Sequence, residues 1–182
     1  MSTVTVAAPA RAATSVTLAG TGTLVRFNLR RDRFALPAWV LGIAGFMLSG
    51  PYAYPDLYPT AQDRANQAAV ITGNPAMKAM TGPGFGIEDY TYGAMLANEY
   101  LGFVLILVGL MATFTVVRHT RVEEETGRFE LVRASAVGRY AHLAAALLTA
   151  ALASLVLGLI VAVGLGTSGV ESIDWPGSLL FG

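Results

Sequence analysis

Three long runs of apolar residues divide the sequence. They cover residues 34–50, 100–117 and 141–165, and none of them contains Asp, Glu, Lys or Arg. A helix rises ~1.5 Å per residue, so roughly 20 apolar residues are needed to cross a hydrocarbon core of about 30 Å. The first run is short for this task, but tyrosines follow it, and aromatic residues are common at the membrane interface. The pattern therefore predicts membrane-spanning helices over about 34–53, 99–117 and 141–165.

The segment before the first run predicts a helix of a different kind. Residues 23–34 read TLVRFNLRRDRF and would place Arg26, Arg30 and Arg33 on one helical stripe, with Phe34 and other apolar side chains beside it. Such a pattern is typical of a helix that lies in the membrane interface. Residues 1–20 contain no continuous apolar run, and we expect them to form a disordered cytoplasmic tail.

The segment 54–98 is expected to be a long outer loop. Within it, Thr60 and Asp63 have the spacing of a helix N-cap pair, which predicts a short helix over 61–72. Asn74-Pro75 is expected to end that helix. The glycines near residue 84 lack the Gly-Lys-Ser/Thr of a phosphate-binding loop, so a turn is the better interpretation.

A fourth, much shorter apolar stretch follows the third run, at residues 179–181. A loop is expected over 166–177, and residues from 178 read as the opening of another apolar span. We therefore expect 21–182 to be the N-terminal part of a transmembrane domain in a longer polypeptide. The expected fold class is all-α, a polytopic membrane protein with three transmembrane helices and a truncated fourth.

Small residues recur in the third run at steps of four. This spacing places them on one slowly drifting face of a helix, where they allow another membrane helix to approach closely. We interpret them as helix-packing residues in preference to a ligand groove: Ala146, Ala150, Ser154, Gly158 and Ala162.

The basic residues are distributed unequally between the two sides of these spans. Nine lie close to the span ends, from residue 26 up to the first span or between the second and third spans, whereas the segment 51–99 has only Arg64 and Lys78. Because basic residues are retained on the cytoplasmic side, the N-terminus and the segment 118–140 are predicted to be cytoplasmic, in a bacterial inner membrane. The residues expected to anchor the chain at the interface are Arg26, Arg30, Arg31, Arg33 and Trp39.

Composition supports a membrane protein and excludes several other classes. Apolar residues make up 54% of the 182 and charged residues 13%, with no net charge and no cysteine. A disulfide scaffold and a nucleic-acid-binding protein with a basic surface are therefore excluded. The apolar runs contain no carboxylate for a proton relay, and His119 and His142 are too far apart to form a metal-ligand pair.

No catalytic group, metal site or bound cofactor is expected in this chain. Three carboxylates of the expected outer loop could attract a cation, but solvation is the better interpretation of Glu88, Asp89 and Glu99. A membrane enzyme is disfavoured because no paired catalytic groups are present.

The segment 118–139 concentrates charges of both signs. Helical spacing would pair Arg121 with Glu125, Glu124 with Arg128, and Glu130 with Arg133, and Gly127 is expected to break the helix. Exposed pairs of this kind contribute only about 0.5 kcal/mol each. A solvated hairpin is one interpretation. A docking surface for a cytoplasmic partner explains the dense charges better, because charge patterns determine register and partner choice.

Two motifs of the chain resemble those of type-2 ATP-binding-cassette exporter permeases, in particular the actinobacterial exporters of polyketide antibiotics. The longer motif is RHTRVEEETGRFELVRASAVGR, and the earlier LRRDRFALPAWV supports it. The resemblance extends from about Leu24 over the opening third of such a permease. It implies two six-helix halves in one chain, and a loop between spans two and three that docks on a separate ATPase. The coupling residues it implies are Arg121, Glu123, Glu124, Glu125, Gly127, Arg128, Glu130 and Arg133.

The same resemblance implies the partners. ATP and magnesium would bind to an ATPase subunit, a homodimer, and the remainder of the permease or a second half would complete the route for a lipophilic drug-like or antibiotic molecule. Membrane lipids are the other partner, and no nucleic acid is expected. The alternative function is a membrane anchor or scaffold that recruits a cytoplasmic partner through 118–139 without transport.

Overall fold

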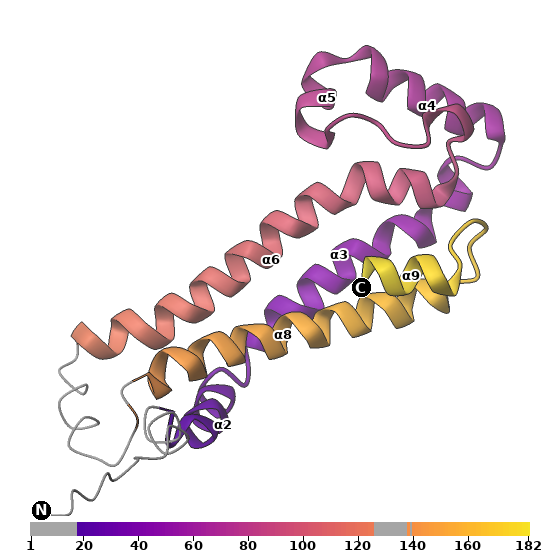
Figure 1. Ribbon diagram of the computed structural model, residues 1–182. Coiled ribbons are helices and arrows are strands. Elements are labelled where there is room, and N and C mark those ends of the chain that lie inside the picture. The colour runs from indigo at the N-terminus through magenta and orange to yellow at the C-terminus, as the bar shows by residue number, and fades with distance from the viewer. Residues whose placement is uncertain (1–17, 126–137, 139) are drawn as a thin grey trace, which may run out of the picture. The chain divides into compact units, whose positions relative to one another are not determined.

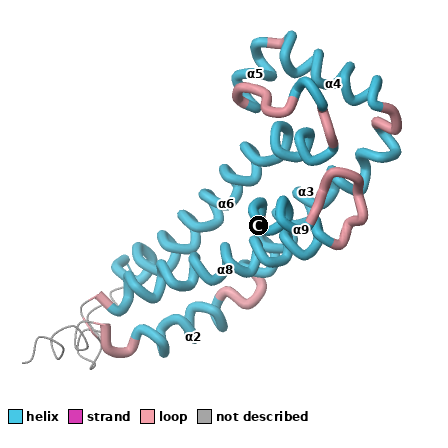
Figure 2. The backbone as a smooth tube through the Cα atoms, turned by 45° about the vertical axis from the view of Figure 1, so that its right-hand side comes forward, coloured by secondary structure: helices cyan, strands magenta, loops and turns pink. Residues whose placement is uncertain are grey.

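The computed structural model describes residues 18–125, 138 and 140–182, and throughout this part of the chain the regular elements are helices (Figure 1). Figure 2 shows that turns and loops join them. The helices are α2 (Thr21–Arg31), α3 (Ala35–Leu57), α4 (Ala61–Gly73), α5 (Pro75–Thr81), the short 3-10 helix η1 (Ile87–Asp89), α6 (Tyr92–Glu125), α8 (Ala141–Gly166) and α9 (Trp175–Phe181). An all-helical polytopic membrane protein is therefore confirmed.

Three of the helices are long and apolar enough to cross a membrane: Ala35–Leu57, Tyr92–Thr120 and Ala141–Gly166. The first continues beyond the predicted 34–53 to Leu57, although Pro51 and Pro55 lie inside it and each removes a backbone hydrogen bond. The helix α6 begins before the predicted 99–117 and continues after it to Glu125. Hydropathy marks only the apolar part of a span, so polar helical extensions are not visible in it.

The chain divides into two compact units. Unit 1 contains Met1–Arg33 and Ala112–Leu152, and unit 2 contains Phe34–Met111 and Ala153–Gly182. The helices α6 and α8 contribute residues to both units. The described part of unit 1 therefore consists of α2, the second part of α6 and the first part of α8.

The hydrophobic core of unit 2 is built from α3, α4, α6 and α8. Ile43, Met47, Ile71, Met95 and Leu165 are all nearly inaccessible to solvent and belong to one cluster. For Ile71, which is on α4 and outside the spans, burial contributes about 1.5–3 kcal/mol relative to exposure in water, whereas side chains inside the spans contribute through close packing. The cluster thus fixes α4, which lies in the expected outer loop, against the apolar helices.

The local signals in the long loop are confirmed. Thr60 accepts a hydrogen bond from the Asp63 amide at 3.2 Å, and the Asp63 carboxylate accepts from the Thr60 amide at 3.1 Å, so α4 begins with a complete capping box. The sequence analysis did not predict α5. Asn74 ends α4 and also caps α5, because its side chain accepts from the Ala76 amide at 2.9 Å and Pro75 occupies the first turn.

The short helix α9 packs on α8 within unit 2, as both views show (Figures 1 and 2). A β-carbon added at Gly158 would collide with the backbone of Gly182, and one at Gly166 would lie 2.5 Å from the Trp175 ring. The two glycines therefore allow the close approach. The helix begins at Trp175, before the predicted 178, because Asp174 accepts a hydrogen bond from the Gly177 amide at 2.8 Å.

Candidate functional site

The predicted coupling residues lie at the end of α6 and beyond it. Arg121, Glu123, Glu124 and Glu125 belong to the helix by their backbone, and their side chains are outside the described part of the structure. Gly127, Arg128, Glu130 and Arg133 lie outside the described residues altogether. The predicted ion pairs among them therefore stay predictions.

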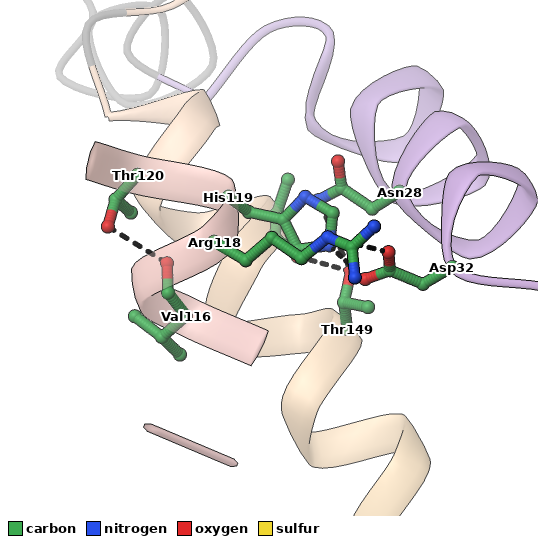
Figure 3. Close-up of polar contacts among 8 residues, drawn as sticks. Asn28, Asp32, Val116, Arg118, His119, Thr120 and Thr149 are labelled. Carbon is green, nitrogen blue, oxygen red and sulfur yellow. Dashed lines mark hydrogen bonds and ion pairs between the residues drawn. The ribbon is translucent and has the colours of Figure 1, made fainter. Parts of the chain in front are cut away.

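A buried polar contact lies at the start of the charged segment 118–139 (Figure 3). Asp32, which follows α2, has its Oδ2 atom 2.6 Å from Nε2 of His119 on α6, and the two side chains are only 3% and 1% exposed. Nε of Arg118 lies 3.2 Å from Oδ1 of the same carboxylate, and this side chain is half exposed. Removing one partner of a buried hydrogen bond leaves the other partner unsatisfied, which costs about 1–3 kcal/mol.

A second polar contact connects α2 with α8. Asn28 donates from Nδ2 to the Thr149 hydroxyl at 3.4 Å, and that hydroxyl donates to the Ala145 carbonyl at 2.7 Å. Asn28 and Asp32 are one helical turn apart and both are buried. Figure 3 shows these side chains converging from three helices. We name Asn28, Asp32, Arg118, His119 and Thr149 the α2 anchor cluster.

This cluster was not predicted from the sequence. Neither Asp32 nor His119 had an assigned role, because 87 positions separate them in the chain. One signal was available: Asn28 and Asp32 are polar residues four apart in the segment 23–34, whose other charged residues are all arginines. The prediction that Arg33 and Phe34 continue the stripe of α2 is wrong. The helix ends at Arg31, and the Asp32 amide donates to the Asn28 carbonyl at 2.9 Å.

The expected anchoring and packing residues have the following positions. Arg26, Arg30, Arg31 and Arg33 are exposed in unit 1, whereas Trp39 is half-buried against the core of unit 2. Ala146 and Ala150 are buried in unit 1. In unit 2, Ala162 is buried and Ser154 and Gly158 are half-buried. Anchoring in lipid headgroups stays a prediction.

A second polar cluster surrounds Glu99 in unit 2. Its carboxylate accepts from Gln67 at 3.2 Å, from the Tyr54 hydroxyl at 3.3 Å and from the Tyr90 hydroxyl at 3.4 Å. Burial and then the Glu99 charge raise the pKa of Tyr90 above its ordinary value. The expectation that Glu99 is simply solvated is wrong. Because α6 begins at Tyr92, Glu99 lies two turns inside a helix and contacts α3 and α4.

The other two loop carboxylates, Glu88 and Asp89, are exposed. Among the described residues, no group of three or more His, Asp or Glu side chains could hold a metal ion. Arg64 uses its Nε to donate to the Tyr90 carbonyl at 3.2 Å, and its guanidinium lies 4.8 Å from the centre of the Tyr92 ring. Arg64 and the Glu99 carboxylate thus both hold α4 near the start of α6.

Comparison with known proteins finds two matches. Residues 22–180 match a family described as the C-terminal domain of the multidrug efflux system permease Rv1217c. The multidrug efflux system permease protein Rv1217c of Mycobacterium tuberculosis is 40% identical to this chain over 169 residues, which are 90% of the chain and 29% of that relative. The chain therefore spans less than a third of the relative's length. The family's description refers to a C-terminal domain, whereas the sequence resemblance led us to expect an N-terminal portion.

Proposed function

Since the chain belongs to the family of the multidrug efflux permease Rv1217c C-terminal domain, we propose that it is a membrane-spanning part of a permease that exports lipophilic drug-like or antibiotic molecules. In this proposal the energy comes from ATP hydrolysis in a separate ATPase subunit, a homodimer that binds ATP and magnesium. The permease itself performs no catalysis. The similarity to type-2 ATP-binding-cassette exporters in 118–139 supports the ATP-driven mechanism.

The observation that carries the proposal is the placement of the α2 anchor cluster. The cluster joins α2, α6 and α8 at residues 118 and 119, immediately before the charged residues that would contact the ATPase. A displacement of this end of α6 must either move α2 and the start of α8 with it or break a buried pair. Within unit 1, the start of the charged segment on α6 is therefore connected to α2, and α2 is connected to α8. Such connections would carry a movement from the ATPase contact to the other helices.

The proposed orientation follows from the charges. The exposed arginines of α2 and the charged segment 118–140 are placed on the cytoplasmic side of the cell membrane, and α4 and α5 on the outer side. The cytoplasmic side is where ATP and the ATPase subunit are available. The charge pattern of 118–139 supplies the specificity for that partner.

The test is a charge exchange in the proposed contact. Glu124→Lys combined with Arg128→Glu is expected to abolish transport of a fluorescent drug and its stimulation of ATP hydrolysis, with normal insertion into the membrane. The matched control exchanges two exposed charges of the opposite side, Lys78→Glu with Glu88→Lys. Wild-type transport by the first variant would contradict the proposal. Binding of a cytoplasmic partner without any transport by the unmodified protein would support a scaffold instead.

A further inference from the structure

A pocket in unit 2 is not used by the proposed coupling contact. It has a volume of about 470 Å³, within the range of sites that bind drug-sized molecules. The end of α3, the start of α6 and the loop after α8 form its walls. The lining residues are Pro51, Tyr52, Pro55, Pro59, Tyr92, Ser168, Gly169, Val170 and Glu171.

The chemistry of the lining favours a flat or apolar ligand with a positive charge. Three prolines offer apolar surface without amide donors, and Tyr52 is 57% exposed, so its ring is open to a ligand. Glu171 is the one charged side chain of the lining. An aromatic face attracts a cation, and a carboxylate beside it adds direct charge attraction.

The surrounding charges act in the same direction. Residues 51–100 and 166–182 carry seven acidic and two basic side chains, a formal charge of −5. One of the two basic residues, Arg64, keeps its positive charge and lies 4.8 Å from the centre of the ring of Tyr92, so it offsets part of this attraction but leaves the net charge negative. A cleft surrounded by one sign of charge raises the local concentration of ligands of the other sign.

The loop that carries Glu171 is held in place before a ligand arrives. The Gly93 amide at the start of α6 donates to the Ser172 hydroxyl at 3.2 Å. A β-carbon at Gly93 would lie 2.8 Å from the Ser172 carbonyl oxygen, so the loop lies directly against α6. Gly169 and Ser172 both have a φ near +66°, a turn conformation that glycine adopts readily and serine rarely. A preformed wall reduces the entropy lost on binding.

The geometry points to a binding site for lipophilic organic cations in this pocket, with Tyr52 as the aromatic contact and Glu171 as the counter-ion. This inference rests on the proposed function, since it names the class of molecule that the permease takes. Binding itself requires neither ATP nor the ATPase. The two proposals can therefore fail separately.

The test measures binding of radiolabelled tetraphenylphosphonium to the purified protein in phosphatidylcholine nanodiscs, with empty nanodiscs subtracted. Glu171→Gln and Tyr52→Ala are each expected to weaken binding about five- to tenfold. The matched control is Glu88→Gln, which removes an exposed carboxylate outside the pocket and is expected to change binding by less than about twofold. Neutral triphenylphosphine oxide is expected to bind no better to the unmodified protein than to Glu171→Gln.

Three results would overturn the inference. The first is no binding to the unmodified protein above empty nanodiscs. The second is an equal loss in Glu171→Gln and Glu88→Gln, which would assign the effect to general surface charge. The third is equal binding of the neutral probe. Circular dichroism of each variant establishes that it is folded, and Glu171 is exposed, so its replacement leaves no buried group unpaired.

Discussion

Replacing Asp32 with alanine removes the central acceptor of the α2 anchor cluster. His119 is 1% exposed, so its ring would stay buried beside a cavity and without the carboxylate at 2.6 Å. Loss of one partner of such a buried hydrogen bond costs about 1–3 kcal/mol, or about one to two powers of ten in the folding equilibrium. Asp32→Asn keeps one oxygen acceptor, and because neutral hydrogen bonds are roughly half as strong, we expect a smaller loss.

Arg118→Ala is the matched control for this prediction. The Arg118 side chain is 48% exposed, so its contact with Asp32 is screened by solvent and contributes about 0–1 kcal/mol. The expected order of destabilisation is therefore Asp32→Ala, then Asp32→Asn, then Arg118→Ala. The order distinguishes a buried anchor from a general effect of charge at this end of α6.

The assay is reversible unfolding in mixed micelles, followed by far-ultraviolet circular dichroism. A second readout follows α2 alone. The sequence contains no cysteine, so one introduced at position 24 of α2 reports local opening through its rate of maleimide labelling. Labelling is expected to accelerate in Asp32→Ala. Equal stability of Asp32→Ala and Arg118→Ala, with unchanged labelling, would refute the reasoning.

Three other predictions follow from unit 2. Gly158→Leu is expected to destabilise the chain by about 1–3 kcal/mol because a side chain there collides with Gly182, whereas Gly109→Leu, which has open space, is expected to be neutral in the same unfolding assay. Glu99→Ala leaves the buried Tyr90 hydroxyl without its acceptor, a loss of about 1–3 kcal/mol that hydrogen exchange should detect as weaker protection of α4; unchanged protection would disprove it. Since the pKa of Tyr90 is raised above the unfolded value of 10.0, the stability it contributes is complete below pH 10.0 and is lost as the pH rises further; Tyr90→Phe should reduce this decline in alkaline unfolding curves, and an unaltered decline would count against it.

Hydropathy and local capping signals predicted much of the fold, and they failed where tertiary contacts decide. The capping pair at Thr60 predicted α4 because both partners lie within one turn. The α2 anchor cluster was not predicted, because a histidine at the end of a span gives no sign of a carboxylate 87 positions away. Glu99 was predicted to be solvated for a related reason. Its contacts exist because α6 begins at Tyr92, before the apolar run, and the polar residues there supply no periodic signal of a helix.

The coupling residues illustrate a different limit. Their assignment came from similarity to a family motif, and the side chains at 121–125 and the segment 126–137 lie outside the described part of the chain. What the described residues add is that the first two residues of that motif, Arg118 and His119, belong to the α2 anchor cluster. The pocket around Glu171 had no sequence signal, since α3, α6 and the loop after α8 each supply only part of its wall.

The central claim is that the charged end of α6 contacts an ATPase subunit. The most direct measurement is photocrosslinking in cells from an unnatural amino acid at position 124, with position 88 as the control. We expect a crosslink to an ATPase subunit from position 124 and none from position 88. Absence of that crosslink at position 124, or equal crosslinking from both positions, would contradict it.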